Sequence, residues 1–251
     1  MLREDTVFGP IRSRRLGWSL GINLLPTKGK LCNFDCIYCE CGWNRDGRED
    51  KTLPTAAQVR RALEDKLADV LLNGTRVDSI TFSGDGEPTL NPDFPQIIKD
   101  TLALRDIYCP DAKVSVLTNA TRLDDDGVFE ALRSVDSPIL KLDSPTDEGA
   151  RIINGALPSY SVAGVVAGMK RFHGDFILQT MFLKAPEFDS LSQANLNGWM
   201  NLVRELKPRL IMAYTIARPT PEEGLLPYTE KEITDALKPL FDEGFKIQVN
   251  A

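Results

Sequence analysis

Residues 19–41, SLGINLLPTKGKLCNFDCIYCEC, decide how the chain is interpreted. Residues 19–25 form a short apolar run that ends before a proline, which is typical of a buried strand. The loop that follows carries four of the five cysteines of the chain. A strand that leads directly into a loop of reactive side chains is typical of an α/β protein, whose ligands bind at the carboxyl ends of strands.

The rest of the chain alternates strand-like and helix-like segments. Thr55 is a candidate N-cap for a helix that runs to Leu72, with Val59, Leu63 and Leu67 on one face. Six βα units in succession predict a parallel sheet with helices outside, built either as a doubly wound layer or as an open barrel. Further helices are expected at 94–107, 125–133, 161–172, 193–206 and 230–241, and strands at 78–82, 113–117, 139–142, 176–183, 208–214 and 245–249.

Composition excludes several classes of function. The 251 residues carry a formal net charge of −6, so binding of nucleic acid through bulk charge is not expected. No apolar run of about 18 residues exists, so we expect no membrane span. The first ten residues, MLREDTVFGP, lack an apolar signal core, and we expect a cytoplasmic protein. The single histidine, His173, argues against His-based zinc sites and catalytic triads.

Three cysteines of the loop, Cys32, Cys36 and Cys39, have the spacing CxxxCxxC. Thiolates are soft ligands that suit iron–sulfur clusters and zinc. Three of them on one compact loop can hold three irons of a [4Fe-4S] cluster and leave the fourth iron open to a cofactor or substrate. Two alternatives are a structural zinc site completed by Cys41 or a distant ligand, and a redox dithiol formed by Cys36 and Cys39.

With the aromatic Tyr38 before its last cysteine, this motif resembles that of the radical S-adenosylmethionine (SAM) superfamily. The resemblance implies an α/β, partial (β/α)6 TIM-like barrel, in which Cys32, Cys36 and Cys39 each bind one iron of the cluster. SAM would chelate the fourth iron, and one electron from a flavodoxin- or ferredoxin-type reductant would cleave it. The products would be methionine and a 5′-deoxyadenosyl radical that abstracts a hydrogen atom from the substrate.

A second motif, Gly84-Asp85-Gly86-Glu87, follows the strand at 78–82. Glycines permit close backbone approach to a ligand, and a carboxylate accepts hydrogen bonds from a cationic amine. The motif resembles the Gly-Gly-Glu of the superfamily, which contacts the amino group of SAM, although Asp85 stands where a glycine is usual. The alternative is a plain turn.

Polar residues also follow the later strands. Asn119 comes after the third strand, and Lys141 and Asp143 alternate onto one face at the end of the fourth. By resemblance, Asn119, Lys141, Asp143 and Gln179, together with Tyr38, belong to the SAM site, and Lys141 and Asp143 are also the candidates for catalysis. The alternatives are a turn residue for Asn119, a Lys–Asp pair that only closes the barrel, and an ordinary strand residue for Gln179.

Residues 8–17 (FGPIRSRRLG), the GEPTL block and residues 151–155 (RIING) resemble a subgroup related to wyosine-forming tRNA enzymes. Those enzymes build a second cluster on cysteines upstream of the triad, whereas no cysteine precedes Cys32 here. The two remaining cysteines are interpreted as a spectator, a substrate-facing thiol or a hydrogen-atom donor (Cys41) and as a structural residue (Cys109). Candidate substrate contacts are Arg12, Arg14, Arg15 and Arg218. For the first three, the alternative is a solvated segment that leads into the barrel.

We therefore predict one domain over residues 1–251, with an N-terminal extension at 1–18 and a final helix and short strand at 222–251. The predicted function is a radical SAM enzyme that acts on an unidentified small molecule or tRNA base. One alternative is an activating enzyme that installs a glycyl radical on a protein partner. Another is a non-catalytic iron–sulfur or zinc protein, although such a carrier has no use for a methionine site at Gly86 and Glu87.

Overall fold

The computed structural model describes residues 5–13, 16–46 and 51–250. The chain divides into two compact units. The first contains residues 1–32, 44–118 and 124–138, and the second contains residues 33–43, 119–123 and 139–251. Each helix in the described ranges is too short or too polar to cross a lipid bilayer.

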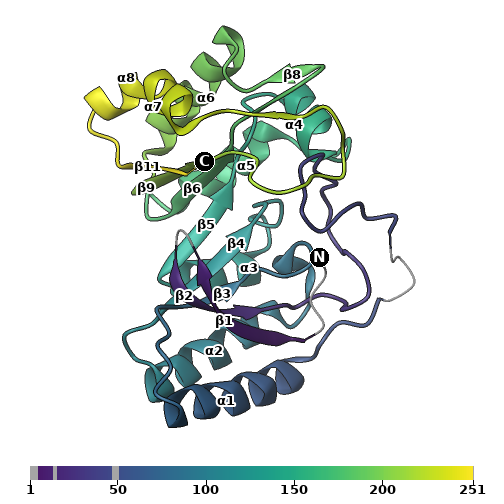
Figure 1. Cartoon of the computed structure of the whole chain (residues 1–251), viewed down its shortest axis with the longest axis vertical. Helices are drawn as coiled ribbons and strands as arrows, with labels where there is room; N and C mark the ends of the chain where they lie inside the picture. Colours follow the sequence, from purple (N-terminus) through teal and green to yellow (C-terminus); the bar gives the residue numbers. More distant parts are fainter. Residues whose placement is uncertain (1–4, 14–15, 47–50, 251) are drawn as a thin grey trace. The chain divides into compact units, whose positions relative to one another are not determined.

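The first unit is a strand layer with helices packed beside it (Figure 1). Strands β2, β3 and β4 are parallel, and β1 pairs with β2 in the antiparallel sense. Helices α1 and α2 lie side by side, and α3 packs next to α2. The bounds are β1 (Val7–Ser13), β2 (Gly17–Ile22), α1 (Ala56–Leu72), β3 (Ser79–Phe82), the 3-10 helix η1 (Pro88–Leu90), α2 (Phe94–Tyr108), β4 (Lys113–Thr118) and α3 (Asp126–Ser134).

The apolar spacing of this unit produces its core directly. Thr55 caps α1 as predicted, because its side chain accepts from the N–H of Gln58 while the Gln58 side chain accepts from the N–H of Thr55. The predicted face of α1, with Val59, Leu63 and Leu67, is buried. All four residues of β3 are buried as well, which is characteristic of a parallel strand covered on both faces.

The second unit also contains parallel strands and helices. The end of β5 pairs with β6, β6 with β9 and β9 with β11, all in parallel (Figure 1). A small antiparallel sheet has the order β10-β7-β8. The bounds are β5 (Ser137–Lys141), α4 (Asp147–Asn154), α5 (Val162–Lys170), β6 (Ile177–Met181), β7 (Leu183–Ala185), β8 (Phe188–Asp189), α6 (Gln193–Leu206), β9 (Leu210–Tyr214), β10 (Leu226–Pro227), α7 (Glu230–Ala236), α8 (Lys238–Asp242) and β11 (Ile247–Asn250).

The strand predicted at 19–25 is β2, at Gly17–Ile22, and four further features differ from the sequence prediction. The region expected as a plain extension contains β1, in which Gly9 and Pro10 are unusual strand residues and mark the point where the register with β2 shifts. Helix α4 was not predicted, because eight residues are too few for a clear helical period. The helix expected at 230–241 is two helices, since Pro239 has no N–H for the preceding turn. The small sheet was also missed, because its strands are only two or three residues long.

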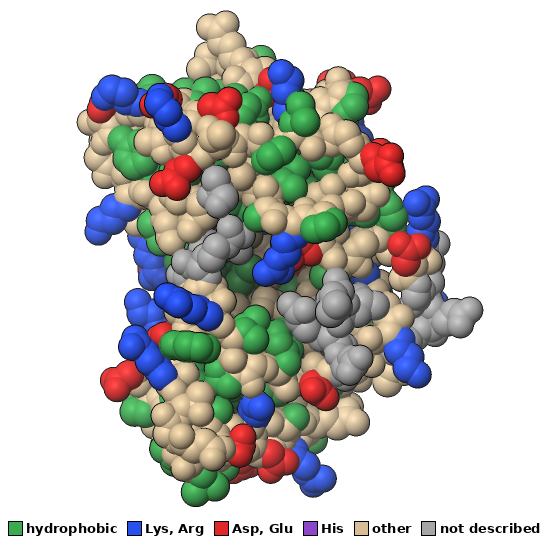
Figure 2. All heavy atoms as spheres, in the orientation of Figure 1, with side chains coloured by type: hydrophobic (Ala, Val, Ile, Leu, Met, Phe, Trp, Pro, Cys, Tyr) green, Lys and Arg blue, Asp and Glu red, His purple; other side chains and the backbone are tan. Residues whose placement is uncertain are grey.

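The surface carries charges of both signs. Figure 2 shows basic and acidic side chains interspersed with hydrophobic ones over the face in view. Several exposed pairs are direct contacts between opposite charges, for example Arg204 with Glu243 and Lys238 with Asp242. Such mixing is consistent with the modest net charge of −6.

Candidate functional site

In the first unit, the glycine-rich turn after β3 lies directly against the residue that precedes Cys32. The N–H of Leu31 donates to the carbonyl of Asp85 at 3.0 Å, and the N–H of Glu87 donates to the carbonyl of Leu31 at 3.0 Å. Gly86 between them has φ +141°, and a Cβ added there would lie 1.8 Å from the Leu31 oxygen. Only glycine permits this approach. The second motif therefore fixes the start of the cysteine loop.

The two carboxylates of this turn are buried, with Asp85 1% and Glu87 2% exposed. Asn23 donates through Nδ2 to Asp85 Oδ2 at 3.2 Å. Glu87 Oε1 accepts from the N–H of Thr89 at 3.1 Å, from Thr89 Oγ1 at 2.6 Å and from Thr118 Oγ1 at 2.6 Å. A buried carboxylate needs donors that replace its water, and these side-chain and main-chain groups supply them. A contact between Glu87 and the SAM amine stays a prediction.

Cys32 has its own main-chain clamp in this unit. Its N–H donates to Asn44 Oδ1 at 3.2 Å, and Asn44 Nδ2 donates back to the Cys32 carbonyl at 3.0 Å. The Asn44 amide thus satisfies both main-chain groups of Cys32. These bonds hold the backbone of Cys32 and involve no thiol atom.

In the second unit, the cysteine loop is docked on the last turn of α4. The final carbonyls of a helix lack partners within it. Here the N–H of Asp35 donates to the Asn154 carbonyl at 2.8 Å, and the N–H of Ile37 donates to the Ile153 carbonyl at 3.1 Å. Gly155 ends the helix in the left-handed conformation, and a Cβ there would lie 2.8 Å from the Asp35 oxygen. Cys36 therefore lies between two residues that are tied to α4.

Asn119, predicted to be part of the SAM site, also contacts the cysteine loop. Its Nδ2 donates to Asn33 Oδ1 at 2.6 Å, while its Oδ1 accepts from the N–H of Thr121 at 3.1 Å. Asn33 Nδ2 donates in turn to Thr121 Oγ1. The structure thus gives Asn119 a role in shaping the loop, and its contact with SAM stays a prediction.

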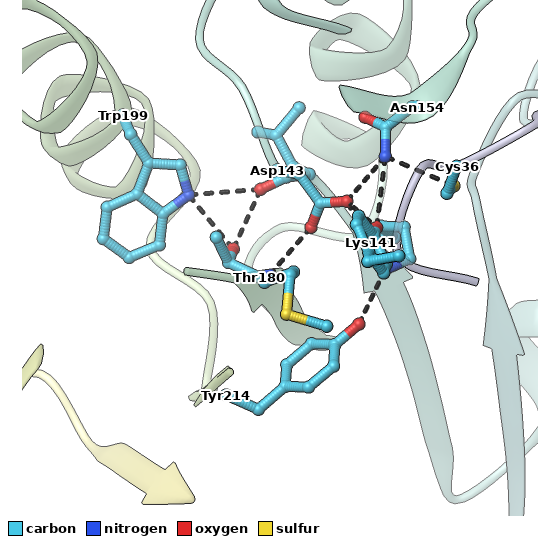
Figure 3. Close-up of polar contacts among 10 residues, drawn as sticks. Cys36, Lys141, Asp143, Asn154, Thr180, Trp199 and Tyr214 are labelled. Carbon is cyan, nitrogen blue, oxygen red and sulfur yellow. Dashed lines mark hydrogen bonds and ion pairs between the residues drawn. The ribbon is translucent and has the colours of Figure 1, made fainter. Parts of the chain in front are cut away.

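A buried polar network surrounds Asp143, the residue two positions after β5 (Figure 3). Its carboxylate accepts from Tyr38 Oη, from Asn154 Nδ2 at 2.7 Å and from the N–H of Met181 at 2.9 Å. Lys141 Nζ lies 3.4 Å from Asp143 Oδ2. The expected placement of Lys141 and Asp143 on one face is therefore observed, and their catalytic role stays a prediction.

Lys141 is held between two tyrosines. Its Nζ donates to Tyr38 Oη at 2.9 Å and to Tyr214 Oη at 2.8 Å, and lies 5.0 Å and 5.3 Å from the two ring centroids. Gln179 is the register partner of Lys141 on β6, so both side chains lie on the same face of the sheet. Ring faces and hydroxyls together surround a fixed positive charge.

The electrostatics of this network fix its protonation states at neutral pH. Burial by itself lowers the pKa of Lys141, but the Asp143 carboxylate, with Tyr214 and Cys36, raises that pKa above its ordinary value. Burial, reinforced by Asp143, raises the pKa of Tyr38 well above its ordinary value. Lys141 is therefore a cation, and Tyr38 a neutral phenol that donates to Asp143.

Cys36 is the buried member of the predicted triad, whereas Cys32 and Cys39 are half-buried. Burial raises the pKa of the Cys36 thiol, while the Lys141 ammonium acts in the opposite direction. Within the described ranges, the structure does not gather three His, Cys, Asp or Glu side chains into a ready-made metal site. The donor chemistry of a three-cysteine loop fits an iron–sulfur cluster, and the ligand set itself stays a prediction.

The remaining candidates are the arginines and Cys109. Arg12 is exposed, while Arg14 and Arg15 lie outside the described residues. Arg218 contacts the cysteine loop, because its Nη1 lies 2.5 Å from Glu40 Oε2 in an exposed ion pair. Cys109 ends α2, and burial raises its pKa.

Sequence reasoning missed three residues that hold the site, Asn44, Asn154 and Tyr214. Tyr214 ends a predicted strand, so the rule that ligands bind at carboxyl ends offered a signal for it. Asn154 belongs to the RIING stretch, where an asparagine before a glycine is typical of a helix end. Asn44 gave no signal, because a loop asparagine has many ordinary uses.

Comparison with known proteins identifies the fold. The structure of a radical SAM methyltransferase from Sphaerobacter thermophilus matches with a TM-score of 0.69 and 16% identity, covering 92% of this chain and 65% of that one. The chain therefore has the predicted α/β fold of a partial TIM-like barrel. Its organisation as a single domain stays a prediction.

Two curated relatives match nearly the whole chain. A "GTPase Obg" of Brachyspira hyodysenteriae is 29% identical over 255 residues, which is 99% of this chain and 35% of that protein. A UPF0026 protein of Methanocaldococcus jannaschii is 29% identical over 241 residues, which is 94% of this chain and 71% of that protein. The chain thus spans about a third of the first relative and most of the second.

The family model described as the radical SAM superfamily matches residues 27–179, more than half of the 251 residues. The match contains Cys32, Cys36 and Cys39 and the turn from Gly84 to Glu87. Together with the partial barrel, it shows that this chain belongs to the radical SAM superfamily.

Proposed function

We propose that this chain is an enzyme that holds a [4Fe-4S] cluster on Cys32, Cys36 and Cys39 and uses it to cleave SAM reductively. The bound cluster and SAM would supply the 5′-deoxyadenosyl radical that abstracts hydrogen from the substrate. The observation that carries the proposal is the family match over residues 27–179, which contains all three cysteines in their CxxxCxxC spacing.

The buried network supports a site for a charged cofactor. Lys141 is a fixed cation at the carboxyl end of β5, and only 16% of its side chain is exposed. We propose that this ammonium, with Gln179 beside it, binds the carboxylate or ribose of SAM. In this role Asp143, Tyr38 and Tyr214 position Lys141, because they contact its Nζ and limit its rotation.

The turn from Gly84 to Glu87 supports a second part of the SAM site. Gly86 brings the turn against Leu31, one residue before Cys32. We propose that Asp85 and Glu87 provide the negative charge that receives the SAM amine. We further propose a flavodoxin- or ferredoxin-type electron donor and a substrate that is a small molecule, a tRNA base or a protein.

Product analysis after anaerobic reconstitution with iron and sulfide tests the proposal. With dithionite and SAM, the protein is expected to form 5′-deoxyadenosine and methionine in equal amounts. The Cys36→Ala variant is expected to form neither, whereas Cys109→Ala, which removes a cysteine outside the triad, keeps both. If the wild-type protein binds iron but neither binds nor cleaves SAM, it is a non-catalytic metal protein and the proposal is wrong.

Substrate candidates are tested with the same preparation. Deuterium transfer from a labelled small molecule or tRNA into 5′-deoxyadenosine identifies a directly attacked substrate. A persistent glycyl radical signal on an added protein partner instead identifies an activating enzyme. Each result assigns the hydrogen donor by a different measurement.

A further inference from the structure

The side chain of Asn154 makes a contact that distinguishes Cys36 from an ordinary loop cysteine. Asn154 Nδ2 donates to Cys36 Sγ at 3.4 Å within the buried network (Figure 3). The same nitrogen lies 2.7 Å from Asp143 Oδ2 and 3.1 Å from Tyr38 Oη, so its two hydrogens are shared among three acceptors. Asn154 is 2% exposed, so water does not compete for these bonds.

The main chain of α4 cannot supply this contact. The groups that α4 presents to the cysteine loop are carbonyl oxygens, those of Ile153 and Asn154, and both accept from loop N–H groups. A thiolate needs a donor, and an additional acceptor nearby would disfavour it. The side-chain amide of Asn154 is the donor that this helix end provides to the sulfur.

The backbone around Asn154 keeps the amide in place. Asp35 and Ile37, on either side of Cys36, are bonded to the end of α4. Gly155 lets the chain turn at φ +56° with Asp35 in close contact. The Asn154 amide and the Cys36 thiol are therefore held by the same hydrogen-bonded junction.

We propose that Asn154 is a positioning residue for the cluster: it orients the Cys36 thiolate and raises the reduction potential of the bound cluster. The inference rests on the proposed function. A donor to a ligating sulfur stabilises the more negative, reduced cluster, so its removal lowers the potential. Through its bonds to Asp143 and Tyr38, Asn154 also ties the cluster ligand to the network that holds Lys141.

The test compares two variants that remove the donor, Asn154→Leu and Asn154→Ala, with a matched control. The leucine is close to asparagine in shape, and the alanine covers the case in which leucine does not fold. Trp199→Phe is the control, because Trp199 Nε1 is another buried donor of the same unit and donates to the Leu142 carbonyl and to Thr180 Oγ1. Iron content, melting temperature and cluster midpoint potential are measured after anaerobic reconstitution.

We expect an Asn154 variant either to lose iron or to keep it with a lower cluster midpoint potential. A decrease of about 59 mV corresponds to a tenfold smaller equilibrium constant for one-electron reduction. Trp199→Phe is expected to keep the wild-type iron content and potential. An Asn154 variant with wild-type iron and an unchanged potential would overturn the inference while leaving the proposed function intact. A wild-type protein that takes up no iron would instead refute the proposed function.

Discussion

Replacing Lys141 with methionine tests the buried network quantitatively. The substitution keeps an unbranched side chain, one atom shorter, and removes the ammonium. The Asp143 carboxylate, whose side chain is fully buried, then loses its cationic partner, although it keeps the donors from Tyr38, Asn154 and Met181. The two hydrogen bonds from Nζ to Tyr38 and Tyr214 are lost as well.

Removing one partner of a buried ion pair costs about 3–5 kcal/mol. The three remaining donors to Asp143 place the expected loss of unfolding free energy at the lower end, about 3 kcal/mol. For a chain of this size, about 1 kcal/mol corresponds to a change of about 2–4 °C in Tm, so we expect Tm to fall by about 6–12 °C.

The assay is urea and thermal unfolding of the metal-free protein at pH 7, followed by circular dichroism and tryptophan fluorescence. Lys170→Met is the matched control, because Lys170 forms a half-exposed ion pair with Glu205 in the same unit. Exposed pairs contribute about 0–1 kcal/mol, so this variant is expected to stay close to wild type. A loss below about 1 kcal/mol for Lys141→Met would refute the reasoning.

The pH dependence of the unfolding free energy, measured for wild type and Lys141→Met, gives an independent check. The folded pKa of Lys141 is raised, so its stabilising contribution is complete below the unfolded pKa of about 10.4. It is lost as the pH rises through the higher folded pKa. The stability difference between wild type and Lys141→Met should therefore be constant from pH 7 to about pH 10 and shrink above it. A difference that shrinks already between pH 7 and 9 would contradict this assignment.

Two further predictions concern the start of the cysteine loop. Gly86→Ala should destabilise the protein by about 3 kcal/mol or more, because its Cβ would lie 1.8 Å from the Leu31 oxygen. The control Gly74→Ala, at φ +62° in open space, should cost only about 1–2 kcal/mol. Equal losses of unfolding free energy in chemical denaturation would count against the close approach. Asn44→Ala should lower iron retention during gel filtration after reconstitution, because Cys32 loses both main-chain bonds; retention equal to wild type would argue against this clamp.

The sequence was sufficient to predict the regular part of the fold. Helix α6 begins and ends at the predicted residues, and α1 starts at its predicted cap Thr55. These elements have strong local signals, since a cap and an apolar face are visible in one stretch of sequence. Strand β1 was missed because Gly9 and Pro10 interrupt its pattern, and pairing with β2 across a bulge overrides that local signal.

The candidate site was predictable only in part, for a physical reason. The alternation of a strand placed Lys141 and Asp143 on one face, and the structure brings their charged groups within 3.4 Å. The contact between Asn154 and Cys36 joins residues 118 positions apart. Local sequence patterns do not predict contacts between residues so far apart in the chain. The same holds for Tyr214, which reaches Lys141 from β9.

The electron paramagnetic resonance spectrum of the reconstituted, dithionite-reduced protein, recorded before and after addition of SAM, addresses the cluster and its cofactor together. We predict the signal of a reduced [4Fe-4S] cluster that changes shape when SAM binds, that persists in Cys109→Ala and that is absent in Cys36→Ala. A signal that does not change when SAM is added would contradict the assignment of this loop as the site of radical SAM chemistry. So would a Cys36→Ala variant that keeps both the signal and the full iron content.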